Sequence, residues 1–213
     1  MNHLVHGGLT AHELAERPNQ RALAKQRTRE KIVAAAKMLF AERGYEGATI
    51  RDIAKTAGMS TGAVFASFTD KADLFTDIAE TEQAELFAVM RIAAEGLTGR
   101  AAILAMLDAA AGRQLESLAL FQAIMSALWT PGLGEAVRRR LDRRTAVSLI
   151  LGVVQADLAS ETEGGCPTLI AEMIWDAFVA ALRRAALNGL TLESLQARIH
   201  DQTTTILAGP KRD

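Results

Sequence analysis

Residues 49–68 read TIRDIAKTAGMSTGAVFASF, and this stretch decides the predicted fold. It predicts two short helices, because Thr49 and Ser60 each have a side-chain oxygen that accepts a backbone N–H at a helix start. Gly58 lies between the two helices, where a sharp turn needs positive φ. The stretch therefore predicts a helix-turn-helix.

The second predicted helix has small side chains on the face away from its core. Val64 and Phe68 are expected to be buried, whereas the outward face holds Thr61, Gly62, Phe65, Ala66 and Ser67, with Ala63 at its margin. Short side chains let a helix backbone lie deep in the major groove of DNA. Double-stranded DNA is therefore the predicted partner.

The flanking sequence predicts further helices. Before the turn, apolar residues from Ile32 to Phe40 recur at helical spacing, and Gly44 is expected to end that helix. A long amphipathic helix is expected from Lys71 to about Glu95. Further helices are expected at 100–115, 117–129, 134–159, 167–188 and 191–207. No segment alternates for long enough to predict a strand.

The predicted fold class is therefore all-α, with a three-helix head joined to a larger helical body. The expected divisions are a flexible tail at 1–24, a helix-turn-helix domain at 25–70, and an effector-binding and dimerisation domain at 71–213. The long helix that begins near Lys71 belongs to both of the last two parts.

The composition of the 213 residues narrows the functional class. Residues 1–71 have a net charge of +4 and the rest of the chain −5, as expected for a phosphate-binding head on an acidic body. The most apolar stretch, AVSLILGVV, has only nine residues, so no membrane span is expected. A single cysteine and the lack of a secretory signal indicate a cytoplasmic protein. No cofactor, metal site or catalytic motif is found.

Candidate phosphate contacts lie around the helix-turn-helix. The helix starts at Thr49 and Ser60 favour an anion, and Lys71 opens the following helix. Further positive charge comes from Lys25, Arg27, Arg29 and Arg51. With the outward face of the second helix, these residues form the predicted DNA-binding set.

Residues 28–75 resemble the DNA-binding head of the tetracycline-repressor (TetR) family. The resemblance depends on an ordered series of positions: Phe40, Gly44, Tyr45, Thr49, Ile53, Ala54, Ala57, Gly58, Ser60, Gly62, Phe68, Lys71 and Leu74. It covers about a quarter of the chain strongly. It implies a ligand-responsive transcriptional regulator, by family habit a repressor that a small effector releases from its operator.

Three departures from the family pattern change the expected readout. Phe65 stands where the family often has Tyr, Ser67 where it often has His, and Thr61 where it often has a basic residue. Residues 60–68 contain no Arg, Lys, Asn, Gln or His, so bidentate contacts to purines are not available there. We expect contacts to thymine methyls from Ala63, Ala66 or Thr61, with further specificity from DNA shape and residues 25–29.

The resemblance also implies a homodimer formed by the last two long helices. The unusually wide apolar surface of 167–188 supports this independently, although burial within one subunit is the alternative. The expected interface residues are Trp175, Phe178, Val179, Leu182, Leu195 and Ile199.

By the same resemblance, the helices between 71 and 159 are expected to enclose an effector pocket. Its expected lining is Phe87, Met90, Leu107, Phe121, Met125, Trp129 and Leu151, which suits a hydrophobic or aromatic effector. Met and aromatic residues at helical spacing are more often plain core packing, and the basic run at 138–144 offers an anion site as a lesser alternative. Two other functions stay open: an enzyme, and a helical small-molecule carrier with weak or lost DNA binding.

Overall fold

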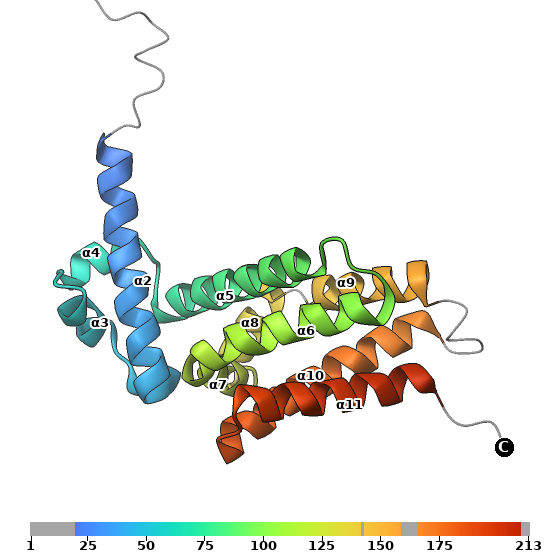
Figure 1. Cartoon of the computed structure of the whole chain (residues 1–213). Helices are drawn as coiled ribbons and strands as arrows, with labels where there is room; N and C mark the ends of the chain where they lie inside the picture. The colour runs from blue at the N-terminus through green and yellow to red at the C-terminus, as the bar shows by residue number, and fades with distance from the viewer. Residues whose placement is uncertain (1–19, 142, 159–165, 210–213) are drawn as a thin grey trace, which may run out of the picture.

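The computed structural model describes residues 20–141, 143–158 and 166–209. Every regular element in these residues is an α-helix, which confirms the predicted all-α class. Figure 1 shows a small group of helices at one end and a longer bundle beside it, linked by α5. The helices are α2 (Gln20–Gly47), α3 (Ile50–Thr56), α4 (Thr61–Phe65), α5 (Lys71–Ala94), α6 (Gly99–Glu116), α7 (Leu118–Ala127), α8 (Leu133–Arg140), α9 (Arg143–Asp157), α10 (Pro167–Asn188) and α11 (Leu192–Ala208).

Helix α2 begins at Gln20, inside the predicted flexible tail. Residues 20–24 are helical, so the predicted tail at 1–24 is too long, and residues 1–19 lie outside the described part of the chain. The reason is local, because Gln, Arg, Ala, Leu and Lys are all strong helix formers. At the other end Gly44 interrupts the helix with φ 68° and ψ 179°, as the predicted helix stop requires.

The head has its own apolar core, formed by α2, α3, α4 and the first half of α5. Phe40 and Phe75 meet edge to face with ring centroids 4.9 Å apart, and Tyr45 lies 5.0 Å from Phe75. Ile53 and Val64 are fully buried in the same cluster. Because these residues come from all four helices, they fix the angle between the two helices of the turn.

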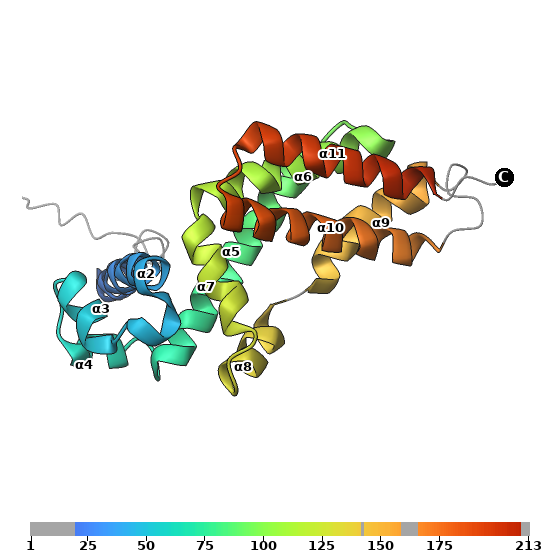
Figure 2. The ribbon, with the colours of Figure 1, turned by 90° about the horizontal axis from the view of Figure 1, so that it is seen from below.

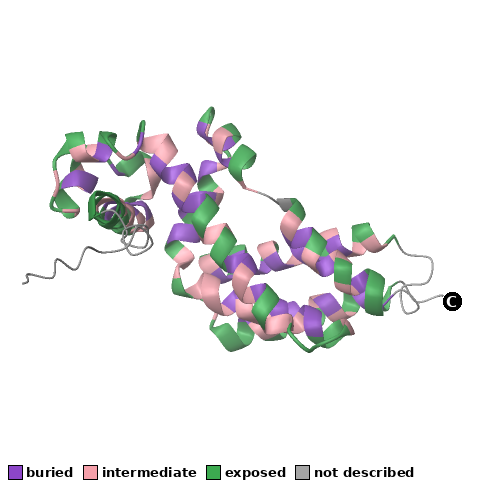
Figure 3. Cartoon of the chain, turned by 90° about the horizontal axis from the view of Figure 1, so that it is seen from above, coloured by how far each residue is buried: buried purple, intermediate pink, exposed green. Residues whose placement is uncertain are grey.

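Helices α7 and α8 also pack against the head core. Leu120, Ile124 and Val137 belong to that cluster, although they lie in the part of the chain predicted to form the body. Helix α7 packs against α2 and α8 against α5, and Figure 2 and Figure 3 show α7 and α8 on the side of the bundle that meets the head. The core of the head therefore extends beyond residue 70.

The second half of α5 joins the body core, which includes α6, α7, α9, α10 and α11. Leu86, Phe87 and Met90 pack in this cluster, whereas Leu74, Phe75 and Ile78 on the same helix pack in the head. One continuous helix thus belongs to both cores, as the sequence predicts.

The single helix predicted at 134–159 is wrong, because the structure divides it into α8 and α9. Leu141 leaves the helical region with ψ 118°. It packs against the head core, whereas Ala146 and Ile150 of α9 pack in the body core. Apolar residues on either side of the break thus serve different cores, and the chain changes direction between them.

Candidate nucleic-acid interface

Both predicted caps of the helix-turn-helix are present. The Thr49 hydroxyl accepts the Asp52 N–H at 3.1 Å and donates to the Asp52 carboxylate at 2.7 Å. The Ser60 hydroxyl accepts the Ala63 N–H at 3.2 Å. The Thr49 hydroxyl is therefore occupied within the head, beside a carboxylate that disfavours a second anion. Ser60 still has its hydroxyl hydrogen to donate.

The turn between α3 and α4 depends on Gly58, as predicted. Its φ is 68°, in the left-handed region that L side chains rarely adopt. Next to it the Met59 N–H donates to the Ala54 carbonyl at 2.8 Å, which closes the turn. The direction of α4 relative to α3 therefore follows from local backbone geometry.

Helix α4 presents a face of mostly small side chains to solvent. Thr61, Gly62, Phe65 and Ala66 are exposed, while Ala63 and Ser67 are half-buried. The opposite side is anchored by fully buried Val64, and Phe68 just beyond the helix is buried as well. The predicted outward face is thus present, with Ser67 less exposed than expected because its hydroxyl donates to the Ala63 carbonyl at 3.3 Å.

Arg29 does not stand free for a phosphate, so the structure corrects its predicted role. Its guanidinium pairs with the Asp77 carboxylate of α5 and donates to the Ser67 carbonyl at 3.3 Å. It also lies 4.2 Å from the centroid of the Phe68 ring. Arg29 therefore fixes α2 against the residues that follow α4 and against α5.

Lys71 needs the same correction. Its ammonium donates to the Tyr45 carbonyl at 2.8 Å and to the Ala48 carbonyl at 3.1 Å, and it lies 4.0 Å from the centroid of the Tyr45 ring. Burial, followed by the charges of Glu46 and Asp70, raises the pKa of Tyr45. Lys71 thus holds the end of α2 and the residue that follows it to the start of α5.

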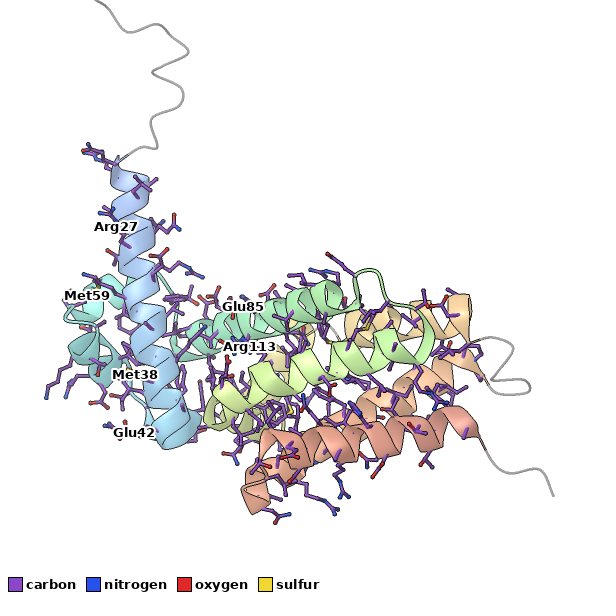
Figure 4. The ribbon with its side chains drawn as sticks, in the orientation of Figure 1. Arg27, Met38, Glu42, Met59, Glu85 and Arg113 are labelled. Atoms are coloured by element: carbon purple, nitrogen blue, oxygen red, sulfur yellow. The ribbon has the colours of Figure 1, made fainter. Side chains whose placement is uncertain are left out.

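Three of the predicted cations are exposed. Lys25 and Arg27 lie on the first turns of α2, and Arg51 lies on the first turn of α3. Figure 4 shows Arg27 on the part of α2 that extends away from the rest of the molecule. These side chains are available to phosphates without breaking a described ion pair.

The predicted effector residues form packed core in this structure. Phe87, Met90, Leu107 and Phe121 are buried in one cluster, and Met125 and Leu151 pack against it partly buried. Trp129 is wrong as a lining residue, because it is 83% exposed. It follows the end of α7, where the chain turns at the surface toward Pro131 and Gly132.

A cleft of about 180 Å³ lies between the end of α2 and α7. Its lining consists of Arg43, Gly44, Tyr45, Glu46, Ala123, Ser126, Ala127 and Thr130, and none of the predicted effector residues is among them. It lies where the head meets the body rather than inside the body core.

Most of the predicted dimer residues lie inside the subunit. Trp175, Phe178, Leu182, Leu195 and Ile199 are all buried in the body core, where Trp175 stacks on Phe178 with centroids 5.3 Å apart. Only Val179 is partly buried. The wide apolar stripe of α10 thus reflects packing against α9, α6 and α11 as well as an outer face. That outer face has exposed Leu169, Met173 and Leu187.

Sequence reasoning missed a polar bridge between head and body. The carboxylate of Glu82 on α5 pairs with Lys37 of α2 at 2.6 Å and with Arg113 of α6 at 2.8 Å. Burial by itself would lower the pKa of Arg113, but Glu85 and Glu82 more than reverse this and raise it. Lys37 and Arg113 each lie 31 or more residues from Glu82 in the sequence, and helical periodicity does not predict a pairing over that distance.

Two kinds of site are absent from the described residues. They contain no group of three or more His, Cys, Asp or Glu side chains arranged to hold a metal ion. Of the helices within 20–141, 143–158 and 166–209, none is both long and apolar enough to cross a membrane.

Two short helices meet at a glycine turn, and the second presents small side chains to solvent. On an all-helical body, this arrangement defines a helix-turn-helix protein. A family model described as "Bacterial regulatory proteins, tetR family" matches residues 32–78. The head of this chain is therefore similar to the DNA-binding head of tetR-family regulators.

Curated relatives share the head rather than the whole chain. The HTH-type transcriptional repressor AcnR of Corynebacterium diphtheriae is 44% identical over 62 residues, which are 29% of this chain and 33% of that protein. The HTH-type transcriptional regulator AcrR of Shigella flexneri is 38% identical over 61 residues, 29% of this chain and 28% of the relative. The matched part of the chain thus spans about a third of the length of these relatives.

Solved structures share the whole fold at low identity. A putative transcriptional regulator from Pseudomonas aeruginosa PAO1 has a TM-score of 0.71 and 19% identity, and the alignment covers 91% of this chain and 94% of that one. The regulator FadR from Bacillus subtilis, solved in complex with stearoyl-CoA, has a TM-score of 0.73 and 18% identity, with 85% and 99% covered. These likenesses show that head and body together form a known arrangement.

Proposed function

We propose that this protein is a DNA-binding transcriptional regulator that a small effector controls, and that it acts as a repressor. The observation that carries the proposal is the exposed face of α4, where Thr61, Gly62 and Ala66 leave room for a duplex while Val64 locks the helix to its core. Repression is supported by the relatives, several of which are named transcriptional repressors.

Binding is expected to depend strongly on salt. Lys25, Arg27 and Arg51 provide three exposed cations per head, or six in a dimer. Six phosphate contacts correspond to a loss of affinity of roughly a thousandfold between 50 and 200 mM salt. Base readout would use apolar contacts to thymine methyls and the shape of the DNA, since α4 has no long polar side chain.

A gel shift with the DNA that flanks the protein's own coding region, at two salt concentrations, tests the proposal. Ala66→Glu puts a carboxylate on the exposed face of α4, and we expect it to weaken binding at least tenfold. Ala84→Glu makes the same change at an exposed position on α5 and is the matched control. If Ala66→Glu binds like Ala84→Glu, or if the wild type binds no duplex, DNA recognition by this face is wrong.

We propose a homodimer that uses the outer faces of α10 and α11. Leu169, Met173 and Leu187 are 53%, 46% and 83% exposed, and steps of four and fourteen residues place them on one side of α10. To bind half-sites in successive major grooves, the two heads of the dimer need to lie about 34–36 Å apart. We expect Met173→Asp to give monomers in sedimentation experiments; a dimer that persists would contradict this interface.

We propose that the effector is apolar and enters the body core between α5, α6, α7 and α9. The support is the apolar cluster around Phe87, Met90 and Leu107, together with the stearoyl-CoA bound by the B. subtilis protein of the same fold. The effector would lower operator affinity by binding one arrangement of head and body better than another.

Tryptophan fluorescence gives a direct test of this effector site. The chain has two Trp residues, so Trp129→Phe leaves Trp175, which is 8% exposed beside Phe87 and Phe178, as the only reporter. Titration with fatty acyl or aromatic compounds is expected to change its emission and to release DNA at the same concentrations. A change in emission without release of DNA would instead favour the second candidate function, a carrier.

The second candidate is a helical small-molecule carrier with weak or lost DNA binding. The observation that favours it is the lack of Arg, Lys, Asn, Gln and His from Ser60 to Phe68. A protein that binds an apolar compound but shifts no duplex even at 50 mM salt would support the carrier over the regulator.

A further inference from the structure

The cleft at the joint between head and body is separate from the core in which the apolar effector is proposed to bind. Its volume is about 180 Å³, and its walls are the end of α2 and the second half of α7 with the residues that follow it. Figure 1 and Figure 2 show these two helices next to each other. Sites for drug-sized ligands have volumes of about 300 Å³ or more, so an occupant of this cleft has to be small.

Small residues and one aromatic ring form the apolar part of the lining. Ala123 and Ala127 of α7 are both buried. Gly44 lines the opposite wall, and a Cβ added there would meet no atom within 4 Å. The Tyr45 ring is held in place, because it packs 5.0 Å from the Phe75 ring, centroid to centroid. The cleft is therefore preformed, and a ligand would lose little free energy in ordering its walls.

Three polar side chains of the cleft have unused hydrogen-bonding capacity. The hydroxyls of Ser126 and Thr130 lie one helical turn apart at the end of α7. The Glu46 carboxylate lies at the end of α2. Within the described part of the chain, none of these three side chains forms a hydrogen bond or an ion pair. A bound polar molecule would therefore displace only water from them.

Arg43 provides the positive charge of the cleft and is only loosely paired. Its Nε lies 3.5 Å from Glu42 and its Nη1 lies 4.0 Å from Asp52, whereas a charge-assisted hydrogen bond is about 2.7–2.9 Å long. No ion pair joins Arg43 to Glu46 in the described chain, since Gly44 leaves the helical conformation between them. The cleft thus has a positive and a negative group that do not neutralise each other.

We propose that this cleft binds a small zwitterion, a free α-amino acid. The ligand carboxylate pairs with Arg43 and its ammonium pairs with Glu46, while the hydroxyls of Ser126 and Thr130 complete the hydrogen bonds of these charged groups. The ligand side chain lies against the apolar wall of α7. Glu46 opposes a simple anion and Arg43 opposes a simple cation, so the two charges together select a molecule that has both.

An amino acid in this cleft touches both the head and the body. The α2 wall belongs to the head, whereas α7 also packs in the body core through Phe121. Binding therefore favours one arrangement of α2 on α7, which gives the protein a second input besides the apolar effector. The effect on operator affinity rests on the proposed DNA-binding function, whereas binding of the amino acid does not.

Isothermal titration calorimetry of the full-length wild type with each of the twenty free amino acids tests this site. We expect at least one to bind with a Kd of about 1 mM or tighter, as suits a ligand of about ten non-hydrogen atoms. The N-acetyl form of that amino acid lacks the positive charge, and its carboxamide lacks the negative charge. Each of these two compounds is expected to bind about tenfold more weakly or worse.

Two single variants locate the ligand in the cleft. Arg43→Gln and Glu46→Gln each remove one charge from an exposed residue, and each is expected to weaken binding about tenfold or more. The matched controls are Arg91→Gln and Glu95→Gln, which remove the same charges from exposed residues at the far end of α5. Both controls are expected to bind as wild type does, and circular dichroism checks that all four variants are folded.

Three calorimetric results would overturn the proposed site. The first is that none of the twenty amino acids binds the wild type. The second is that Arg43→Gln and Glu46→Gln bind as tightly as the controls, which would place the ligand elsewhere. The third is that the N-acetyl form binds as tightly as the free amino acid, which would show a plain anion site.

A gel shift with and without saturating amino acid measures the coupling to DNA. We expect operator affinity to change about fivefold or more, and the change is expected to be lost in Glu46→Gln. An unchanged operator affinity would overturn the second input. A wild type that binds the amino acid but shifts no duplex would contradict the proposed DNA-binding function and leave the amino-acid site standing.

Discussion

Glu82→Gln tests whether the ion pairs of Glu82 stabilise the packing of the head on the body or are only charges at the surface. The Glu82 side chain is 11% exposed, and its two oxygens lie 2.6 Å from Lys37 Nζ and 2.8 Å from Arg113 Nη2. One carboxylate therefore joins α2 of the head to α6 of the body through α5. Figure 4 shows Arg113 of α6 next to Glu85 of α5.

The expected cost follows from the burial of the three partners. Breaking a fully buried ion pair costs about 3–5 kcal/mol. Lys37 and Arg113 are 29% and 22% exposed, so water compensates in part, and Arg113 keeps Glu85 at 2.6 Å. We therefore expect a loss of about 2 kcal/mol in the free energy of unfolding, roughly half the buried value. At about 2–4 °C per kcal/mol for a chain of this size, Tm should fall by about 4–8 °C.

Urea and thermal unfolding of the full chain measure this, with Glu85→Gln as the matched control. Glu85 lies one helical turn away, pairs with the same Arg113, and is 49% exposed, so its loss should cost at most about 1 kcal/mol. The double variants Glu82→Gln/Lys37→Met and Glu82→Gln/Arg113→Met should be less destabilised than the sums of their single changes. Equal losses for Glu82→Gln and Glu85→Gln would refute the bridge.

Three further changes test other parts of the structure. Gly134→Ala should destabilise the protein by about 3 kcal/mol, because the new Cβ would lie 2.3 Å from a carbonyl oxygen at the end of α7. Gly112→Ala, whose new Cβ would have nothing within 4 Å, should stabilise α6 by about 1 kcal/mol. Urea midpoints that shift alike in the two variants would contradict this. Lys71→Met should lower the urea midpoint, because the Lys71 ammonium is hydrogen-bonded inside the head, and it should leave the slope of log DNA affinity against log salt unchanged. An unchanged midpoint with a smaller slope would show a direct phosphate contact instead. A hydrogen bond from the Thr69 backbone N–H lowers the pKa of Asp73 against the opposing effect of burial, and Arg140 lowers this pKa further. The stabilisation by Asp73 is therefore present above the unfolded pKa of about 4 and is lost as pH falls through the folded pKa. Asp73→Asn should therefore unfold more easily than wild type at pH 7 and equally easily below that range in acid titrations; a difference that persists at low pH would contradict this.

Much of the head could be predicted from the sequence because its determinants are local. Thr49 and Ser60 cap their helices within three residues, and Gly58 makes its turn within the same span. Helical periodicity likewise predicted the buried faces of α2 and α5. Such signals act over one or two turns, so a single sequence contains them in full.

The partners of long side chains could not be predicted in this way. Arg29 and Lys71 are cations beside a DNA-binding motif, which favours a phosphate role, yet their partners lie 23 or more residues away and hold them inside the head. Trp129 fits a pocket by residue type, but the chain turns at the end of α7 and leaves it at the surface.

The sequence by itself determined that this protein is all-helical, that Gly58 hinges a helix-turn-helix, and that α4 presents small side chains. Only the tertiary structure decided which face of α10 is inside, that α7 and α8 complete the head core, and that Glu82 joins head to body. The physical reason is range, because caps, turns and periodicity depend on neighbours along the chain, whereas burial and ion pairing depend on residues that only the packed fold brings together.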